Sequence, residues 1–529
     1  MLDPVSALHI LGRAGYGASP SSLRELSDAG AAAWIETQLA PRPDLDADCN
    51  ERLRAARLRI KYPAGDGWTA MDAARPLATL DAPISTLWHL VDHKNPMHVL
   101  ERRRPRDEVI AATVLRAVHS RWQLREVMCG FWHDHFNVDA AGSEAIGVAL
   151  PAYDRDVIRR HCFGNFRELL ESCATSAAMQ YYLSNRSSRA GSANENYARE
   201  LFELHTLGRA AYLNDRYDRW REVPGAEHGK AAGYIDQDVY EAARAFTGWT
   251  IEDGTGIDAH RKLPQSGQFV YVENWHDGYQ KRVLATEFDA FAPALADGRQ
   301  VLDLVAAHPA TARFLCDKLC RRFFGEDAPA QVRERMVQVW SAHVESHDQI
   351  ARVLRTLLLS REFAAANGAT GRHAAAKVRR PLALAAAFAR AMEIDLVYTV
   401  ELGNEISSAG QNLFGWPTPT GLPDSAAPFL SSQAMRHRWS MLLGLAENSW
   451  GNGAIASPAA GSALTTQTAT AALFTRQLGV VPQERVSAIV SGCGWPADEP
   501  LQANGPADAP RRWARLAAYC AMTPEFQVS

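Results

Sequence analysis

Apolar residues recur at helical spacing over most of this 529-residue chain. The clearest segments follow one another at residues 300–307, 310–324, 330–346 and 348–360. Such spacing gives each helix an apolar face that must be buried against other elements. The best strand signal is short, at residues 268–272 and 282–284. The chain is therefore predicted to be mainly α-helical, a large multi-helix domain with a short β-hairpin insertion at about residues 268–285.

A polar break at residues 366–371 divides the helical pattern. We predict a main helical domain over residues 1–365, which includes the hairpin, and a C-terminal helical portion over residues 372–529 that packs on it. No stretch reaches 18 uninterrupted apolar residues, so no transmembrane helix is predicted.

The stretch at residues 194–208 carries the strongest functional pattern. Asn194 and Gly208 are residue types that often begin and end helices. Its polar residues stand at steps of four and three, which places them on one helix face: Asn196, Glu200 and Glu203, with Arg199 beside them. Because a buried unpaired carboxylate is very costly, this face needs a metal, arginines or water as its partner.

Three further segments combine histidine or carboxylate with core-type neighbours. They are His133 and His135 between aromatic residues, Asp238 and Glu241 with Arg244 on a predicted helix, and His276 and Asp277 in the turn between the two strand signals. Two histidines separated by one residue lie on one side of an extended strand but diverge on a helix. That spacing is common among metal ligands, and it also suits two histidines hydrogen-bonded inside an aromatic core.

The sequence resembles a large bacterial family known as domain of unknown function 1800. The motifs that carry the resemblance are residues 9–20, 131–136, 194–208, 238–249, 276–278, 308–312 and 410–414, and it extends over roughly residues 7–445. The family has no established activity and supplies no catalytic residues. The resemblance implies frequent export, and frequent encoding beside a second family that is similar to sulfatases and phosphatases.

Histidine and carboxylate together suit zinc, iron or manganese. We predict metal ligands at His133, His135, His276 and Asp277. Catalytic carboxylates are predicted at Glu200, Glu203, Asp238 and Glu241, with Arg199 and Arg244 as positioning or anion-binding groups. One shared cleft would let these groups satisfy one another, whereas separate buried clusters would each be desolvated. The competing interpretation, given equal weight, is a structural ion-pair network of the same arginines and glutamates.

Two functions follow from these patterns and the resemblance. The first is a metal-assisted hydrolase acting on an envelope or extracellular substrate. The alternative is a non-catalytic helical protein that binds or stabilises a co-encoded sulfatase- or phosphatase-like enzyme. A net charge of −4 argues against general nucleic-acid binding. The N-terminus has no basic stretch followed by an apolar run, which favours the cytoplasm, whereas the resemblance implies export.

Overall fold

The computed structural model describes residues 3–326, 328–366, 377–456, 458, 464–501 and 509–529. These residues form many helices and three small two-stranded sheets, so the mainly α-helical class is confirmed. None of the helices in these ranges is both long and apolar enough to span a bilayer.

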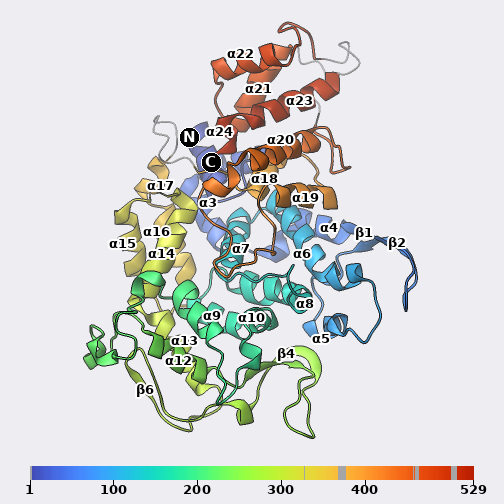
Figure 1. Cartoon of the computed structure of the whole chain (residues 1–529). Coiled ribbons are helices and arrows are strands. Elements are labelled where there is room, and N and C mark those ends of the chain that lie inside the picture. Colours follow the sequence, from blue (N-terminus) through green and yellow to red (C-terminus); the bar gives the residue numbers. More distant parts are fainter. Residues whose placement is uncertain (1–2, 327, 367–376, 457, 459–463, 502–508) are drawn as a thin grey trace.

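The helices of the first half surround the centre of the molecule (Figure 1). They are α1 (Pro4–Arg13), α2 (Pro20–Ala29), α3 (Ala31–Leu39), α4 (Ala47–Ala55), α5 (Ile84–Leu87), α6 (Val99–His119), α7 (Gln123–His135), α8 (Glu144–Ala152), α9 (Phe166–Ala174), α10 (Ala177–Tyr182), α11 (Glu195–Glu200) and α12 (Asp236–Ala245). A π-helical turn, η3, spans Tyr153–Arg159, and a second, η5, spans Leu201–His205.

The helices of the second half also pack around this centre, and the last of them extend the molecule at one end (Figure 1). They are α13 (Ala296–Ala307), α14 (Pro309–Phe324), α15 (Ala330–Ala342), α16 (Gln349–Leu358), α17 (Arg361–Ala365), α18 (Pro381–Ala391), α19 (Val400–Ser408), α20 (Ser432–Ala446), α21 (Thr466–Leu478), α22 (Gln483–Gly492), α23 (Ala509–Met522) and α24 (Pro524–Gln527). Helices α21–α23 lie at one end and α12 and α13 at the other, with α7 between them.

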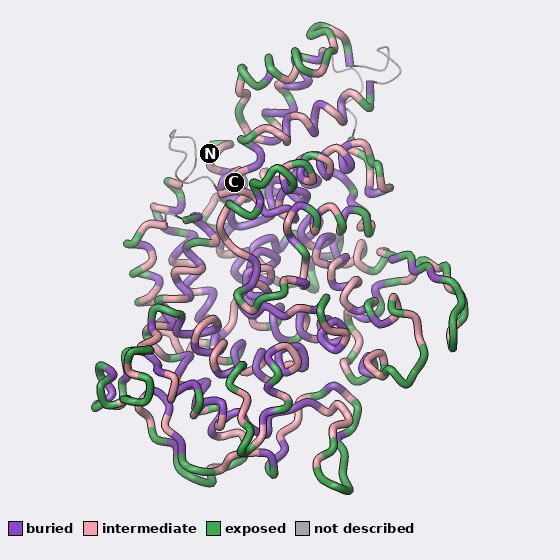
Figure 2. The backbone as a smooth tube through the Cα atoms, viewed as in Figure 1, coloured by how far each residue is buried: buried purple, intermediate pink, exposed green. Residues whose placement is uncertain are grey.

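One continuous set of buried apolar residues extends from Ala7 to Phe526. Figure 2 shows buried residues along the interior of the molecule. Both predicted portions of the chain therefore contribute to the same core. The polar break predicted at residues 366–371 lies almost wholly outside the described residues, so the division into residues 1–365 and 372–529 stays a prediction.

The strand pairing differs from the predicted hairpin. Strand β4 (Gln265–Tyr271) pairs with β3 (Trp249–Asp253), and β5 (Lys281–Val283) pairs with β6 (Thr286–Phe288). The third sheet joins β1 (Arg57–Tyr62) to β2 (Met71–Pro76). The two segments expected to pair thus belong to different sheets. The reason is local: Leu284 and Ala285 both adopt positive φ, 50° and 61°, which closes β5 and β6 with a two-residue turn.

The stretch at residues 194–208 has the predicted ends but not a single helix. The Asn194 side chain accepts a hydrogen bond from the Asn196 backbone N–H at 2.9 Å, and Gly208 has a φ of +81°. Between them α11 gives way to the π-helical turn η5. A π turn changes the angular step between side chains, so the regular face expected for Asn196, Glu200 and Glu203 is interrupted before Glu203.

Candidate functional site

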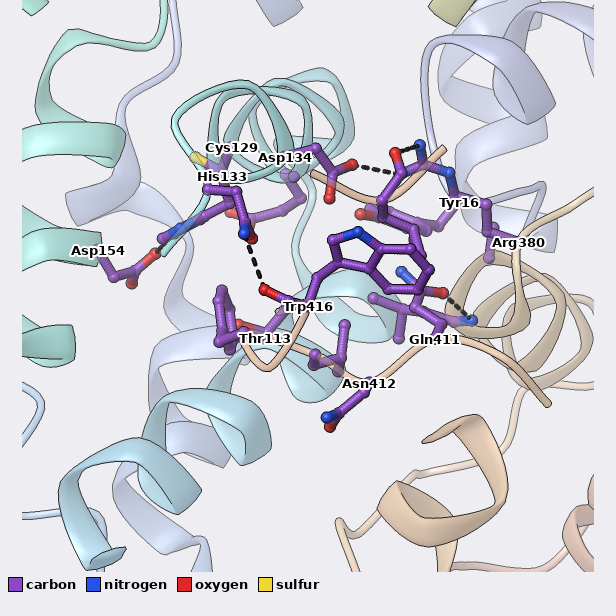
Figure 3. Close-up of a pocket in the computed structure, with 18 of the residues that line it drawn as sticks. Tyr16, Thr113, Cys129, His133, Asp134, Asp154, Arg380, Gln411, Asn412 and Trp416 are labelled. Atoms are coloured by element: carbon purple, nitrogen blue, oxygen red, sulfur yellow. Dashed lines mark hydrogen bonds and ion pairs between the residues drawn. The ribbon is translucent and has the colours of Figure 1, made fainter. Parts of the chain in front are cut away.

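A cavity of about 70 Å³ lies beside α7, near the centre of the fold (Figure 3). Its walls come from segments far apart in the chain: Tyr16, Thr113, Glu126, Cys129, Gly130, His133, Asp134, Asn137, Val138, Asp154, Arg159, Arg322, Arg380, Leu382, Ala383, Gln411, Asn412, Leu413, Phe414, Trp416 and Leu422. A cavity of this size holds a few water molecules or one small chemical group.

His133 lies on the wall of this cavity and is paired with a carboxylate. Because α7 is a regular helix up to His135, the side chains of His133 and His135 diverge. The Nε2 atom of His133 lies 2.9 Å from Oδ1 of Asp154. Across the described part of the chain, no group forms a hydrogen bond with the other ring nitrogen, Nδ1. His133 thus has one nitrogen held by Asp154 and one that remains free.

Asp154 is held in turn by buried arginines. Its Oδ2 accepts hydrogen bonds from Arg159 Nε at 2.7 Å and from Arg116 at 3.4 Å. Arg159 also donates two bonds to Glu126, at 3.0 and 2.9 Å. Burial alone would raise the pKa of Asp154, but Arg159 and His133 lower it well below its ordinary value. Asp154 therefore stays ionised and keeps accepting from His133 at neutral pH.

Two further arginines approach the cavity from α14 and from the start of α18. Arg380 forms ion pairs with Asp134 and Asp424 and also donates to the carbonyl groups of Leu422 and Pro423. Its Nε is buried without a hydrogen-bond partner in the described residues. Arg322 lines the cavity, and its guanidinium forms no ion pair within the ranges given above.

The loop that follows α19 covers part of the cavity and is fastened to α7. The side-chain amide of Asn137 donates to the backbone carbonyls of Trp416 and Thr418, each at 2.9 Å. Gly421 has a φ of +71°, and a Cβ there would lie 1.8 Å from the Asp134 carbonyl oxygen. Only glycine permits this close approach. These contacts attach the loop to the C-terminal end of α7 and to Asn137 just beyond it.

His135, predicted as a metal ligand, has both ring nitrogens occupied in the core. Its Nε2 lies 3.0 Å from the His205 carbonyl oxygen and its Nδ1 2.9 Å from Lys318 Nζ. Burial, with the charge of Lys318, lowers the pKa of His135 well below its ordinary value. It is a neutral core histidine, as the second interpretation of the histidine pair expected.

The predicted residues of α12 and the following turn form an ion-pair cluster of their own. Arg244 bonds to Glu241 at 2.6 Å and to both oxygens of Asp277, at 2.8 and 3.0 Å. His276 lies between the Thr247 carbonyl oxygen at 2.9 Å and Asp297 at 3.2 Å. These bonds fasten the turn to α12 and α13, which matches the structural-network interpretation for Glu241 and Arg244.

Asp238 has a structural task at the start of α12. Its carboxylate accepts hydrogen bonds from the backbone N–H groups of Ile235 at 3.0 Å and Leu284 at 2.7 Å. It thereby caps α12 and holds the β5–β6 turn. Burial raises the pKa of Asp238 to about 6.

The residues of the 194–208 stretch pair near the surface. Arg199 bonds to Glu195 and Asp236, and Glu203 bonds to the exposed Arg209. Burial, with the Glu203 carboxylate nearby, raises the pKa of Glu200. None of these three predicted residues lines the cavity.

The predicted site residues thus divide into several sets rather than one shared cluster, because most of the charged groups find partners on their own or an adjacent element. Of the predicted catalytic and metal-binding residues, His133 alone lines the cavity. Among the residues that the structure describes, no three His, Cys, Asp or Glu side chains gather so as to hold a metal ion. The four predicted ligands His133, His135, His276 and Asp277 do not fit a single metal.

Most residues of the cavity wall were not predicted from the sequence. Asp154, Arg159 and Arg322 stand in ordinary helical segments that carry no signal, and Arg380 comes immediately before α18. A usable signal was present in the motifs that carry the family resemblance: residues 9–20 supply Tyr16, residues 131–136 supply His133 and Asp134, and residues 410–414 supply four wall residues. Their meeting at one cavity depends on the fold.

The fold and the cavity define a mainly helical protein with a buried histidine–aspartate pair beside arginine-lined space. A family model described as a protein of unknown function, DUF1800, matches residues 9–528, nearly the whole chain, and the chain belongs to this family. Neither the curated proteins nor the solved structures contain a match to it.

Proposed function

We propose that this protein is a hydrolase in which His133 acts as the general base, and that its substrate belongs to the envelope or the extracellular space. The observation that supports this most directly is the bond from His133 Nε2 to Asp154, which leaves Nδ1 free at the wall of the cavity. The compartment of the substrate rests on the family resemblance alone.

The chemistry follows from the tautomer of His133. When Nε2–H donates to Asp154, the lone pair of Nδ1 is available to take a proton from a water molecule. The water oxygen then bonds to the electrophilic atom of the substrate. As the bond to the leaving group breaks, the proton passes from His133 to that group. Asp154 stays ionised and stabilises the imidazolium that exists between these two proton transfers.

No step of this proposal passes through a metal, because the predicted ligands do not form one set. A bound transition metal stays a prediction from the sequence. Elemental analysis of protein purified without chelator tests it: about one zinc, iron or manganese per chain would restore a metal-assisted reaction to consideration.

The test is a hydrolysis screen with chromogenic carboxyl esters, phosphate mono- and diesters, sulfate esters and glycosides. On any substrate found, His133→Gln should lower kcat by about 10²–10⁴-fold, with little change in melting temperature. Asp154→Asn should give a similar loss, accompanied by destabilisation because Asp154 is buried among arginines. Glu203→Gln serves as the matched control, because Glu203 lies outside the cavity and pairs with an exposed arginine.

Full activity in His133→Gln contradicts this assignment, and loss of activity in Glu203→Gln returns the site to the 194–208 stretch. A protein that hydrolyses nothing in the screen but binds its co-encoded neighbour supports the non-catalytic alternative.

A further inference from the structure

Several hydrogen-bond donors at the cavity have no acceptor among the described residues. Arg322 lines it without an ion pair among the described residues, and Arg380 Nε is buried without a partner there. Thr113 Oγ1, on α6, is likewise buried and has no partner within the described ranges. A buried polar group left unsatisfied costs about 1–3 kcal/mol, so the two buried atoms at one void, Arg380 Nε and Thr113 Oγ1, indicate that something else accepts from them. Arg322 is half-buried and adds a guanidinium that has no ion pair within the described residues.

The carboxylates of the same walls are already engaged. Both oxygens of Glu126 accept from Arg159, and both oxygens of Asp154 are bonded, to His133 and to the arginines. Asp134 is paired with Arg380. A ligand that fills this cavity therefore meets mainly donors, with the Nδ1 atom of His133 and the side-chain amide oxygens of Asn137 and Asn412 as the exceptions. This pattern selects a ligand rich in acceptor oxygens.

The charge around Arg322 points the same way. Lys318, Lys377 and Arg380 surround Asp424 together with Arg322, and the only other carboxylate bonded to this group is Asp134 among the described residues. Burial, opposed by the Asp424 carboxylate and assisted by Arg322 and Arg380, lowers the pKa of Lys377 to about 7. The region is short of negative charge, which a bound anion would supply.

Tyr16 adds a neutral donor at the same wall. Its ring lies on the cavity side of α7, where a Cβ on Gly130 would be 3.3 Å from the Tyr16 hydroxyl (Figure 3). Burial raises the pKa of Tyr16 to about 12, so its hydroxyl keeps its proton at neutral pH. The cavity, at about 70 Å³, has room for an oxyanion group but not for a large ligand.

We propose that the cavity binds an oxyanion, with Arg322 as its charged ligand and with Tyr16, Thr113 and Arg380 Nε as further donors. The binding itself stands on the geometry. Its consequence for the substrate rests on the proposed function: the molecule hydrolysed carries a carboxylate, phosphate or sulfate group that Arg322 holds beside His133.

Titration calorimetry of the full chain with sodium phosphate, sulfate and acetate tests the binding, at constant ionic strength and with acetamide as the neutral comparison. At least one of the three anions should bind saturably, and acetamide should not. Arg322→Met should weaken that binding about tenfold or more, because a charge-assisted hydrogen bond contributes about 1.5–3 kcal/mol. Arg313→Met, which removes an exposed arginine of the same helix, should leave it unchanged.

Arg322→Met removes no ion pair known from the described residues, so its melting temperature should stay within a few degrees of the parent and show that the variant folds. No saturable binding of any of the three anions, or equal binding by Arg322→Met, overturns the proposal. The preferred anion among the three identifies which group the substrate carries.

The two proposals are separable. His133→Gln should keep the anion affinity within about threefold, a change below 1 kcal/mol, while it loses hydrolysis. Anion binding through Arg322 without any hydrolysis contradicts the proposed function alone. Hydrolysis that neither these anions nor Arg322→Met affects contradicts the oxyanion site alone.

Discussion

The cavity beside α7 and the ion-pair cluster of α12 are built from the same kinds of residue, yet they differ in what remains unpaired. In the α12 cluster, Arg244 joins Glu241 to Asp277, and Lys281 joins Asp297, which also meets His276. Both nitrogens of His276 have partners. At the cavity, His133 keeps one nitrogen free, and donors of two arginines and a threonine face a void. The α12 cluster is not fully satisfied either, because Asp297 Oδ1 is buried without a partner in the described residues. The two regions therefore differ in the kind of group left unpaired, a carboxylate acceptor in the α12 cluster and mainly donors at the cavity, rather than in residue composition.

The largest expected effect comes from the arginine at the centre of the cavity network. Arg159→Met removes the partner of two buried carboxylates, Glu126 and Asp154. Breaking a buried pair in this way costs about 3–5 kcal/mol, because the remaining charges are uncompensated. The midpoint of urea unfolding, followed by circular dichroism, should fall strongly. Arg160→Met is the matched control at the next position, because Arg160 is exposed and forms no ion pair within the described residues, and surface charges contribute about 0–1 kcal/mol. Similar shifts for both variants would remove the distinction between the buried network and the surface.

The second prediction concerns pH, because buried histidines and the buried Asp238 change the free energy of unfolding in opposite directions as the pH falls. Burial lowers the pKa of His205, next to His135, to about 3, and that of His9 to about 4. Their unfolded pKa is about 6.5. The unfolded chain therefore binds more protons below that pH, and the stability these histidines contribute is present above pH 6.5 and lost as the pH falls.

Asp238 acts against this trend. Its folded pKa, raised to about 6, means that its contribution is present below about pH 4 and lost as the pH rises through 6. Three histidines with lowered pKa, including His135, outweigh one aspartate. Each group changes the free energy of unfolding by about 1.4 kcal/mol per pH unit within its window. The melting temperature should fall from pH 7 to pH 5, and His205→Gln should flatten the fall. A melting temperature that rises on acidification would show that carboxyl groups with raised pKa, such as Asp238, affect stability more than these histidines do.

The sequence supported the fold better than the site. Helical spacing identified the class because burial of one face is a local requirement that each segment shows by itself. The Asn194 cap and the Gly208 stop were also local and were confirmed. The strand pairing was not predictable in the same way, since the turn at Leu284 and Ala285 uses positive φ without the usual Asn-Gly. The site depends on tertiary contacts, such as that of Asp154 with His133 and that of Arg380 with Asp134. The spacing of residues along the chain does not predict such contacts.

A third, smaller effect is expected inside the α12 cluster. Lys281→Met deprives the buried Asp297 of a cation that lies 2.6 Å away. Asp297 still has His276 at 3.2 Å as a hydrogen-bonding neighbour. Because one carboxylate loses its cation here, whereas Arg159→Met affects two, the loss of stability should be about 1–3 kcal/mol, below the cost expected for Arg159→Met. Thermal melts of both variants measure this, and an equal or larger loss in Lys281→Met would contradict the ranking of the two regions.

The smallest effect is expected at Arg199, which the sequence placed beside the carboxylates of the predicted site. The Arg199 side chain is 37% exposed, and its ion pairs with Glu195 and Asp236 lie near the surface. Exposed pairs contribute about 0–1 kcal/mol. Arg199→Ala should thus shift the unfolding midpoint only slightly and leave both anion affinity and any hydrolytic rate unchanged, since Arg199 does not line the cavity. Parallel measurement with Arg322→Met gives the sharpest comparison of the two hypotheses about where the chemistry occurs. A large rate loss in Arg199→Ala, with normal melting and normal anion binding, would place the reaction at the α11 face instead of at His133.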